Sequence, residues 1–203
     1  MATQDPEPSK AMLRRDDLRL RLIDLAEAQI ATKGAASLKA RDLAAQAGCA
    51  VGAIYNVFDD MTALVMAVNV RTFARLGDMA VAALAAASGA PPQDQMVALG
   101  RAYLHFAADN LPLWRALFDV AGQGADVPDW YRAALADLFT QIEGPIAALF
   151  PALDRRALDL MVRGLFSSVH GIVQLGLNNR TPAAPLAEIE AMIAMVLREI
   201  GKR

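Results

Sequence analysis

Apolar residues recur at three- and four-residue steps along most of the chain, and this spacing predicts helices rather than strands. Runs of β-branched residues are sparse and alanine is abundant, which also favours helix. Segments rich in glycine and proline interrupt the pattern at residues 88–92 and 121–128. The chain is therefore predicted to be all-α, with helices at residues 16–33, 38–47, 50–57, 61–87, 93–109, 110–120, 129–150 (kinked at Gly144–Pro145), 154–178 and 185–201.

Residues 37–64 carry the most informative local pattern, which is a short helix, a glycine turn and a second short helix that ends on an aromatic residue. Ser37 is expected to cap the first helix, and Gly48 is expected to take the left-handed conformation that ends it. Ile54 and Phe58 lie four residues apart, so both are expected to point into the core. This layout is typical of a helix-turn-helix, whose second helix enters the major groove of DNA.

The outward residues of this region are our candidate DNA contacts. Tyr55 can reach a phosphate with its hydroxyl, and Asn56 can pair with a base edge or a phosphate. Exposed cations nearby can neutralise further phosphates. The full set of candidate DNA-binding residues is Arg14, Ser37, Lys39, Arg41, Ala50, Val51, Ala53, Tyr55 and Asn56.

The same stretch resembles the N-terminal domain of the TetR family of bacterial transcriptional regulators. The resemblance rests on residues 22–27, 33–34, 43–48 and 52–58, followed at the right spacing by Leu64. It implies an all-helical homodimer with an N-terminal three-helix DNA-binding domain and a variable C-terminal domain for ligand binding and dimerisation. On this basis we expect a disordered tail at residues 1–13, a helix-turn-helix domain at 14–60 and a ligand and dimerisation domain at 61–203.

Three positions depart from the family pattern. Ala50 replaces the Ser or Thr that often starts the reading helix, and Val51 stands where a polar residue is frequent. Asp59 and Asp60 follow Phe58, where the family often has a phosphate-binding lysine. Residues 1–65 hold eight Lys plus Arg against nine Asp plus Glu, so this domain is not net basic. The alternative to a DNA-binding regulator is therefore a helical binding or adaptor protein that has lost sequence-specific DNA binding.

A second resemblance lies in the C-terminal part. The run Phe-Ser-Ser-Val-His-Gly at residues 166–171 resembles the Trp-x-x-x-His-Gly motif of one C-terminal subgroup of the family, called WHG, and residues 111–118 fit the same subgroup. Aromatic residues gather in this otherwise aromatic-poor domain, which indicates either core packing or a cavity for a small hydrophobic effector. The candidate ligand-binding residues are Tyr103, Phe106, Trp114, Phe118, Trp130, Tyr131, Phe166 and His170.

The last two predicted helices are unusually apolar, and in the family such helices pair with their copies in a dimer. Small residues at 164, 167, 168 and 171 would let another helix approach closely. The candidate dimer-interface residues are Leu165, Val169, Ile172, Ile189, Ile193 and Val196. The alternative for each of them is an ordinary core position within one chain.

Composition narrows the remaining classes. The single cysteine, Cys49, cannot form an intrachain disulfide, and we expect a cytoplasmic protein without a secretory signal or membrane span. Two histidines cannot build a His-rich metal site, and no nucleophile elbow or phosphate-binding glycine loop is present. The sequence thus predicts no enzyme, metal or cofactor. It predicts a repressor that binds a palindromic DNA operator as a homodimer and is released by an apolar effector.

Overall fold

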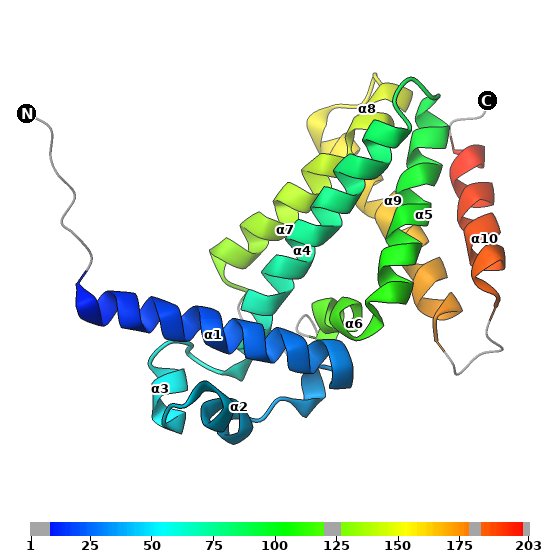
Figure 1. The fold of residues 1–203 in the computed structure, drawn as a ribbon. Coiled ribbons are helices and arrows are strands. Elements are labelled where there is room, and N and C mark those ends of the chain that lie inside the picture. The colour runs from blue at the N-terminus through cyan, green and yellow to red at the C-terminus, as the bar shows by residue number, and fades with distance from the viewer. Residues whose placement is uncertain (1–8, 120–126, 179–183, 201–203) are drawn as a thin grey trace, which may run out of the picture. The chain divides into compact units, whose positions relative to one another are not determined.

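The computed structural model describes residues 9–119, 127–178 and 184–200, and this part of the chain forms helices and no strand (Figure 1). The helices are α1 Lys10–Lys33, a 3-10 turn Ala35–Ser37, α2 Ala40–Ala47, α3 Val51–Tyr55, α4 Met61–Ala86, α5 Pro92–Asp109, α6 Leu111–Asp119, α7 Asp129–Ile142, α8 Gly144–Leu149, α9 Arg155–Gly176 and α10 Leu186–Glu199. The predicted all-α class is confirmed. None of the described helices is both long and apolar enough to cross a membrane.

The chain divides into two compact units, and the division falls within α4. The first unit comprises residues 1–71 and 112–126, and the second comprises residues 72–111 and 127–203. In the first unit α1 contacts α2, and α2 contacts α3 (Figure 1). Asn69 of α4 donates a hydrogen bond to the Ala116 carbonyl (3.0 Å), which ties α6 to this unit. Sequence reasoning had placed α6 with the C-terminal residues.

The core of the first unit comes from the periodic apolar positions of its short helices. Leu22, Ile30, Leu43, Ile54 and Leu64 are fully buried. Each such side chain stabilises the fold by about 1.5–3 kcal/mol relative to an exposed one. Because α2 and α3 are too short to be stable alone, this shared core is what holds them as helices.

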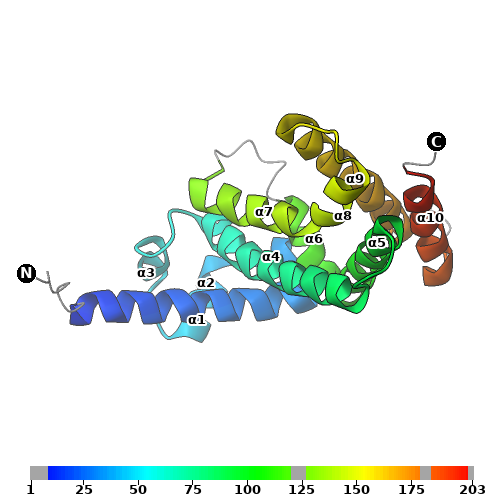
Figure 2. The same cartoon turned by 90° about the horizontal axis from the view of Figure 1, so that it is seen from above.

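The second unit packs α10 against α5 and α9, with α8 next to α5, α7 and α9 (Figure 2). Two glycines allow close helix contacts. A Cβ on Gly100 would lie 2.6 Å from Cγ2 of Ile193, and a Cβ on Gly176 would lie 2.6 Å from Cδ1 of Ile189. Neither distance is compatible with a real side chain, so both positions require glycine if their neighbours are to stay in place.

Two predicted element boundaries were wrong. Helix α1 begins at Lys10 rather than at residue 16, because the Ser9 hydroxyl accepts a hydrogen bond from the Met12 N–H and caps the helix. The expected tail at 1–13 is thus helical from Lys10, and its residues 1–8 lie outside the described part. The interruption expected at Gly144–Pro145 in the helix at 129–150 is present, but it separates two helices instead of kinking one, because Pro145 lacks an N–H and sits in the first turn of α8, where none is needed.

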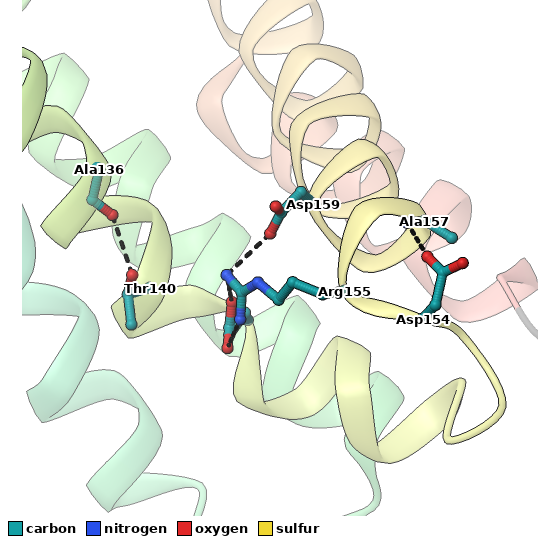
Figure 3. Close-up of polar contacts among 7 residues, drawn as sticks. Ala136, Thr140, Asp154, Arg155, Ala157 and Asp159 are labelled. Carbon is teal, nitrogen blue, oxygen red and sulfur yellow. Dashed lines mark hydrogen bonds and ion pairs between the residues drawn. The ribbon is translucent and has the colours of Figure 1, made fainter.

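Charged side chains link the start of α9 to the residue between α7 and α8. Arg155 donates two hydrogen bonds to Glu143 (2.9 Å each) and pairs with Asp159 at 2.8 Å (Figure 3). Asp154 caps α9 by accepting from the Ala157 N–H (2.8 Å). These contacts fix where one helix ends and the next begins at a point where proline interrupts the backbone bonds.

Candidate nucleic-acid interface

The turn between α2 and α3 has the predicted geometry. Gly48 is in the left-handed conformation (φ 67°, ψ 36°), and the Cys49 N–H returns to the Ala44 carbonyl (3.0 Å). This pair of features ends α2 and redirects the chain into α3 within three residues. The expected role of Gly48 is confirmed.

Helix α3 has one buried side and one open side. Ile54 and the following Phe58 are buried, as their spacing predicted. Tyr55 is 48% exposed and Val51 is 37% exposed. Asn56, which ends the helix, is exposed as well. The helix therefore presents a continuous outer face of small, aromatic and amide side chains while its inner face is anchored in the core.

Most of the other candidate DNA contacts are exposed on the first unit. One of them, Ser37, does not have the structural role that was expected. Arg14 on α1, Lys39, Arg41 on α2 and Ala50 are exposed, and Ala53 is half-buried. Ser37 was predicted to cap α2, and this was wrong. Its hydroxyl donates to the Gly34 carbonyl (2.7 Å) within the 3-10 turn, and α2 begins only at Ala40.

The reason for the Ser37 error is a contact with α1. Gln29 of α1 donates to the Ser37 carbonyl (2.9 Å), which stabilises the turn at residues 35–37 as a separate element. Lys39 then occupies the N-cap position of α2 without a side-chain capping bond. A side chain eight residues earlier in the sequence thus decides where α2 starts, and local capping preferences do not reveal it.

The acidic pair after the reading helix has one structural role. Asp60 accepts a hydrogen bond from the Ala63 N–H (2.6 Å) and so caps the start of α4. Asp59 is exposed. Part of the departure from the family pattern is therefore explained by helix capping.

Arginines of the first unit form contacts that sequence reasoning missed. Arg71 on α4 binds Asp24 (2.6 Å) and Glu27 (2.9 Å) of α1. Burial alone would lower the pKa of Arg71, but these two hydrogen bonds raise it above its ordinary value. Arg21 donates to the Ala47 carbonyl, and Arg19 lies over the ring of Phe58. The pairing of Arg21 with residue 17 follows the i,i+4 rule and was readable in sequence, whereas the others join distant segments.

The candidate ligand-binding residues fall into separate groups. Trp114 and Phe118 belong to the first unit, where their rings lie 5.3 Å apart and Trp114 is buried. Tyr131 is buried in the second unit against Phe73, at 5.2 Å between ring centroids, while its neighbour Trp130 is 45% exposed. Phe106 is half-buried on α5.

The remaining three candidates form one cluster in the second unit. The ring of Phe166 stacks on His170 (5.7 Å, 15°) and meets Tyr103 edge-on (5.6 Å). The Tyr103 hydroxyl and Nδ1 of His170 are hydrogen-bonded at 2.9 Å. Phe139 joins them, 5.1 Å from Phe166, and was not singled out in the sequence. We call Tyr103, Phe139, Phe166 and His170 the aromatic cluster.

Burial changes the charge state that His170 favours. Desolvation lowers the pKa of His170 below its ordinary value, and a hydrogen bond with Gln174 opposes part of that shift. The neutral imidazole is therefore the form that fits the aromatic cluster. His170 packs among these rings with the Tyr103 hydroxyl as a hydrogen-bond partner, and its role in ligand binding stays a prediction.

The candidate dimer-interface residues fall into two groups, one buried within this chain and one partly exposed. Leu165, Val169, Ile189 and Ile193 are buried by this chain alone. The core alternative holds for these four, and they leave no surface for a partner. Val196 is 37% exposed and Ile172 is half-buried.

Comparison with known proteins matches both parts of the chain. Residues 22–68 match the family described as bacterial regulatory proteins, tetR family, and residues 96–200 match the family described as Tetracyclin repressor-like, C-terminal domain. None of the curated proteins matches the chain. The finer WHG resemblance stays a prediction.

Solved structures share the fold. A tetR-family transcriptional regulator from Streptomyces coelicolor has a TM-score of 0.65 at 20% identity, over 91% of this chain and 80% of that one. RolR in complex with resorcinol has a TM-score of 0.66 at 21% identity, over 94% and 96% of the two chains. FadR from Bacillus subtilis in complex with stearoyl-CoA has a TM-score of 0.66 at 15% identity, over 91% and 99%. The chain belongs to the TetR family, which makes it a transcriptional regulator rather than an enzyme.

Proposed function

We propose that this regulator is a repressor that binds a palindromic operator as a homodimer and is released by a small apolar effector. The observation that carries the proposal is that α3 buries one side in the core and leaves its other side exposed. Ile54 and Phe58 fix the helix from within, while Val51, Tyr55 and Asn56 remain open to a groove. A helix with only an inner role would not need to present an aromatic and an amide side chain together at its exposed end.

The charges of the first unit support DNA binding despite their unfavourable total. Three carboxylates are engaged by arginines of the same unit: Asp17 by Arg21, and Asp24 and Glu27 by Arg71. Among the described residues, no ion pair engages the following exposed cations: Lys10, Arg14, Arg15, Lys39 and Arg41. Local pairing thus leaves positive charge available to phosphates, and Lys39 and Arg41 flank the start of α2.

For dimerisation we propose the outer face of α9 and α10 in place of the buried residues. Leu160 and Leu175 on α9 are 63% and 65% exposed, and Met195 on α10 is 68% exposed. Between the two leucines, a Cβ on Gly164 or Gly171 would meet no atom within 4 Å from the other described parts of the chain, apart from its own helix backbone and chain neighbours. Apolar side chains beside small ones on one helix face let a second helix approach closely.

For the effector we propose the aromatic cluster. It combines apolar rings with one hydroxyl and one neutral imidazole, which suits a ligand that is mostly apolar with few polar groups. RolR and FadR were solved with resorcinol and stearoyl-CoA, so members of this fold accept ligands of very different size. Helix α4 is continuous from Met61 to Ala86 and has residues in both units. An effector that binds better to one position of α4 would shift the spacing of the two reading helices.

The test is selection of double-stranded DNA from a random library at about 150 mM salt, followed by sequencing. Recovery of an inverted repeat would support a sequence-reading dimer and provide the operator for effector screening. If no motif is recovered and binding is absent even at low salt, the adaptor alternative replaces this proposal.

A further inference from the structure

The end of α2 is held by a side chain from another helix. Arg21 of α1 donates through Nη1 to the Ala47 carbonyl (3.1 Å), the last residue of α2. Its Nη2 binds Asp17, one turn earlier on α1. The carbonyls at a helix C-terminus have no partner within the helix and carry partial negative charge, so an arginine there satisfies one of them and interacts well with the helix dipole.

The far side of α3 is held from the same helix. Arg19 lies over the Phe58 ring, with Cζ 4.8 Å from the centroid, and Phe58 directly follows the turn that ends α3. The two arginines are only two residues apart on α1, yet Arg21 reaches the residue before Gly48 and Arg19 reaches Phe58, three residues after the end of α3. Together they bracket the segment from Ala47 to Phe58.

The reading helix is short, and besides these contacts it is held by the buried Ile54 and Phe58 and by its packing on α2. Helix α3 is five residues long and buries a single residue, Ile54. Its link to α2 turns through Gly48, the most permissive residue at that point. Because α3 is so short, contacts at the two ends of the segment from Ala47 to Phe58 contribute to the direction in which its outer face points.

We propose that Arg21 is a positioning residue for sequence reading: it sets the angle of the α2–α3 segment on α1 through Ala47 without itself contacting DNA. Asp17 assists by holding the guanidinium in the orientation that reaches the carbonyl. This inference rests on the proposed DNA-binding function. It separates the cations of α1 into two classes, with Arg21 acting through the protein and Arg14 acting on phosphate.

The charge-conserving variant Arg21→Lys tests the idea. An ammonium cannot span Asp17 and the Ala47 carbonyl in the fixed fork of a guanidinium, but it keeps the positive charge. We expect the ratio of affinities for the selected operator and for random duplex to fall about three- to tenfold, as loss of one charged hydrogen bond of modest strength implies. The slope of log affinity against log salt should stay unchanged, because no phosphate contact is lost.

Two further variants sharpen the result. Asp17→Asn should also lower the operator-to-random ratio, although removing an acidic group strengthens binding to random duplex. The matched control Arg14→Gln should lower both affinities alike and reduce the salt slope by about 0.9. All variants are compared well below their melting temperatures, measured by circular dichroism, so that a difference in the ratio cannot come from unfolding.

The outcomes separate the two proposals. A wild-type protein that prefers no sequence overturns the proposed function and this inference with it. A wild-type protein that selects an operator, with Arg21→Lys reading it equally well, overturns the inference alone. A reduced salt slope in Arg21→Lys would make Arg21 a phosphate contact and overturn it as well. A lower ratio in Arg21→Lys and Asp17→Asn, at unchanged slope in the former, supports it.

Discussion

The first unit adds arginine contacts between its helices to the apolar core that they share, whereas the second packs α5, α9 and α10 closely at glycines that admit a neighbour's side chain. In the first unit Arg71 reaches two carboxylates of α1 and Arg21 reaches the end of α2. In the second, Ile193 and Ile189 fill the space over Gly100 and Gly176. Polar contacts on a surface contribute little stability but fix orientation, while close packing contributes much and tolerates little change. Substitutions should therefore alter function in one unit and stability in the other.

The largest effect is expected for Ile193→Glu, because Ile193 is fully buried on α10. A carboxylate there costs several kcal/mol, comparable to the whole stability of a domain, so the second unit should lose its cooperative unfolding. Thermal unfolding followed by circular dichroism measures this. The matched control is Met195→Glu, two residues later and 68% exposed, which should keep a cooperative unfolding transition, with any fall in melting temperature limited to the loss of dimer contacts. Equal melting of both variants would contradict the buried position of Ile193.

The same control variant tests assembly. If the outer face of α9 and α10 is the dimer interface, Met195→Glu should convert a dimer into a folded monomer by light scattering. Val81→Glu on α4, also an exposed apolar position, should leave the dimer intact. A dimer that survives Met195→Glu would remove this face from the interface, whatever its stability.

A smaller loss is expected for Gly100→Ala. The new methyl would meet Cγ2 of Ile193 at 2.6 Å, and overpacking of this kind costs about 1–3 kcal/mol. Gly52 on exposed α3 has nothing within 4 Å of a Cβ, so Gly52→Ala should instead stabilise by about 0.5–1 kcal/mol through helix propensity. Urea unfolding of both variants measures the contrast. The same sign of change in both would show that packing does not distinguish the two units.

In the first unit we expect a change in binding without a change in folding. Lys39→Ala should reduce the slope of log affinity against log salt by about 0.9, since one phosphate contact is lost, and should do so for any DNA sequence. Tyr55→Ala should weaken operator binding while leaving the dimer unchanged. Fluorescence anisotropy at several salt concentrations measures both. An unaltered slope in Lys39→Ala would take that residue off the interface, and an unaltered affinity in Tyr55→Ala would do the same for Tyr55.

The two units also differ in how much of them could be predicted from the sequence. The buried positions of Ile54 and Phe58 and the left-handed Gly48 were predictable, because each depends on spacing within a few residues. The start of α2 was not, because Gln29 on another helix determines it. Ile189 and Ile193 could not be assigned between core and interface, because an apolar stripe looks the same whichever helix covers it.

The aromatic residues show the same limit. Eight candidates were grouped by their nearness in sequence and by type, yet Trp114 and Phe118 belong to the first unit and pack with each other. Phe139 was overlooked although its ring lies 5.1 Å from Phe166. Residues that meet across three helices share no sequence spacing, so neither their inclusion nor their omission could be corrected before the tertiary contacts were known.

The smallest expected effect concerns His170, where a half-buried imidazole gives the second unit a pH response. The folded state disfavours the imidazolium, so the pKa of His170 is lowered, whereas an unfolded histidine binds its proton near pH 6.5. Below that pH the unfolded state holds more protons than the folded state. Stability should therefore fall as the pH falls from about 6.5 towards the lowered pKa of the folded state. It should be regained when the pH is returned above about 6.5.

His170→Gln should remove this component, so that its melting temperature changes less between pH 7.5 and 5.5 than that of the wild type. Most carboxylates titrate below this range and contribute little to the difference. His105→Gln is the control, since His105 is an exposed histidine that contacts Glu190 at 2.6 Å instead of the aromatic cluster. It should keep the loss of stability on acidification that His170 causes. If His170→Gln keeps the wild-type pH slope, the response does not come from His170, and the aromatic cluster tolerates a charged imidazole.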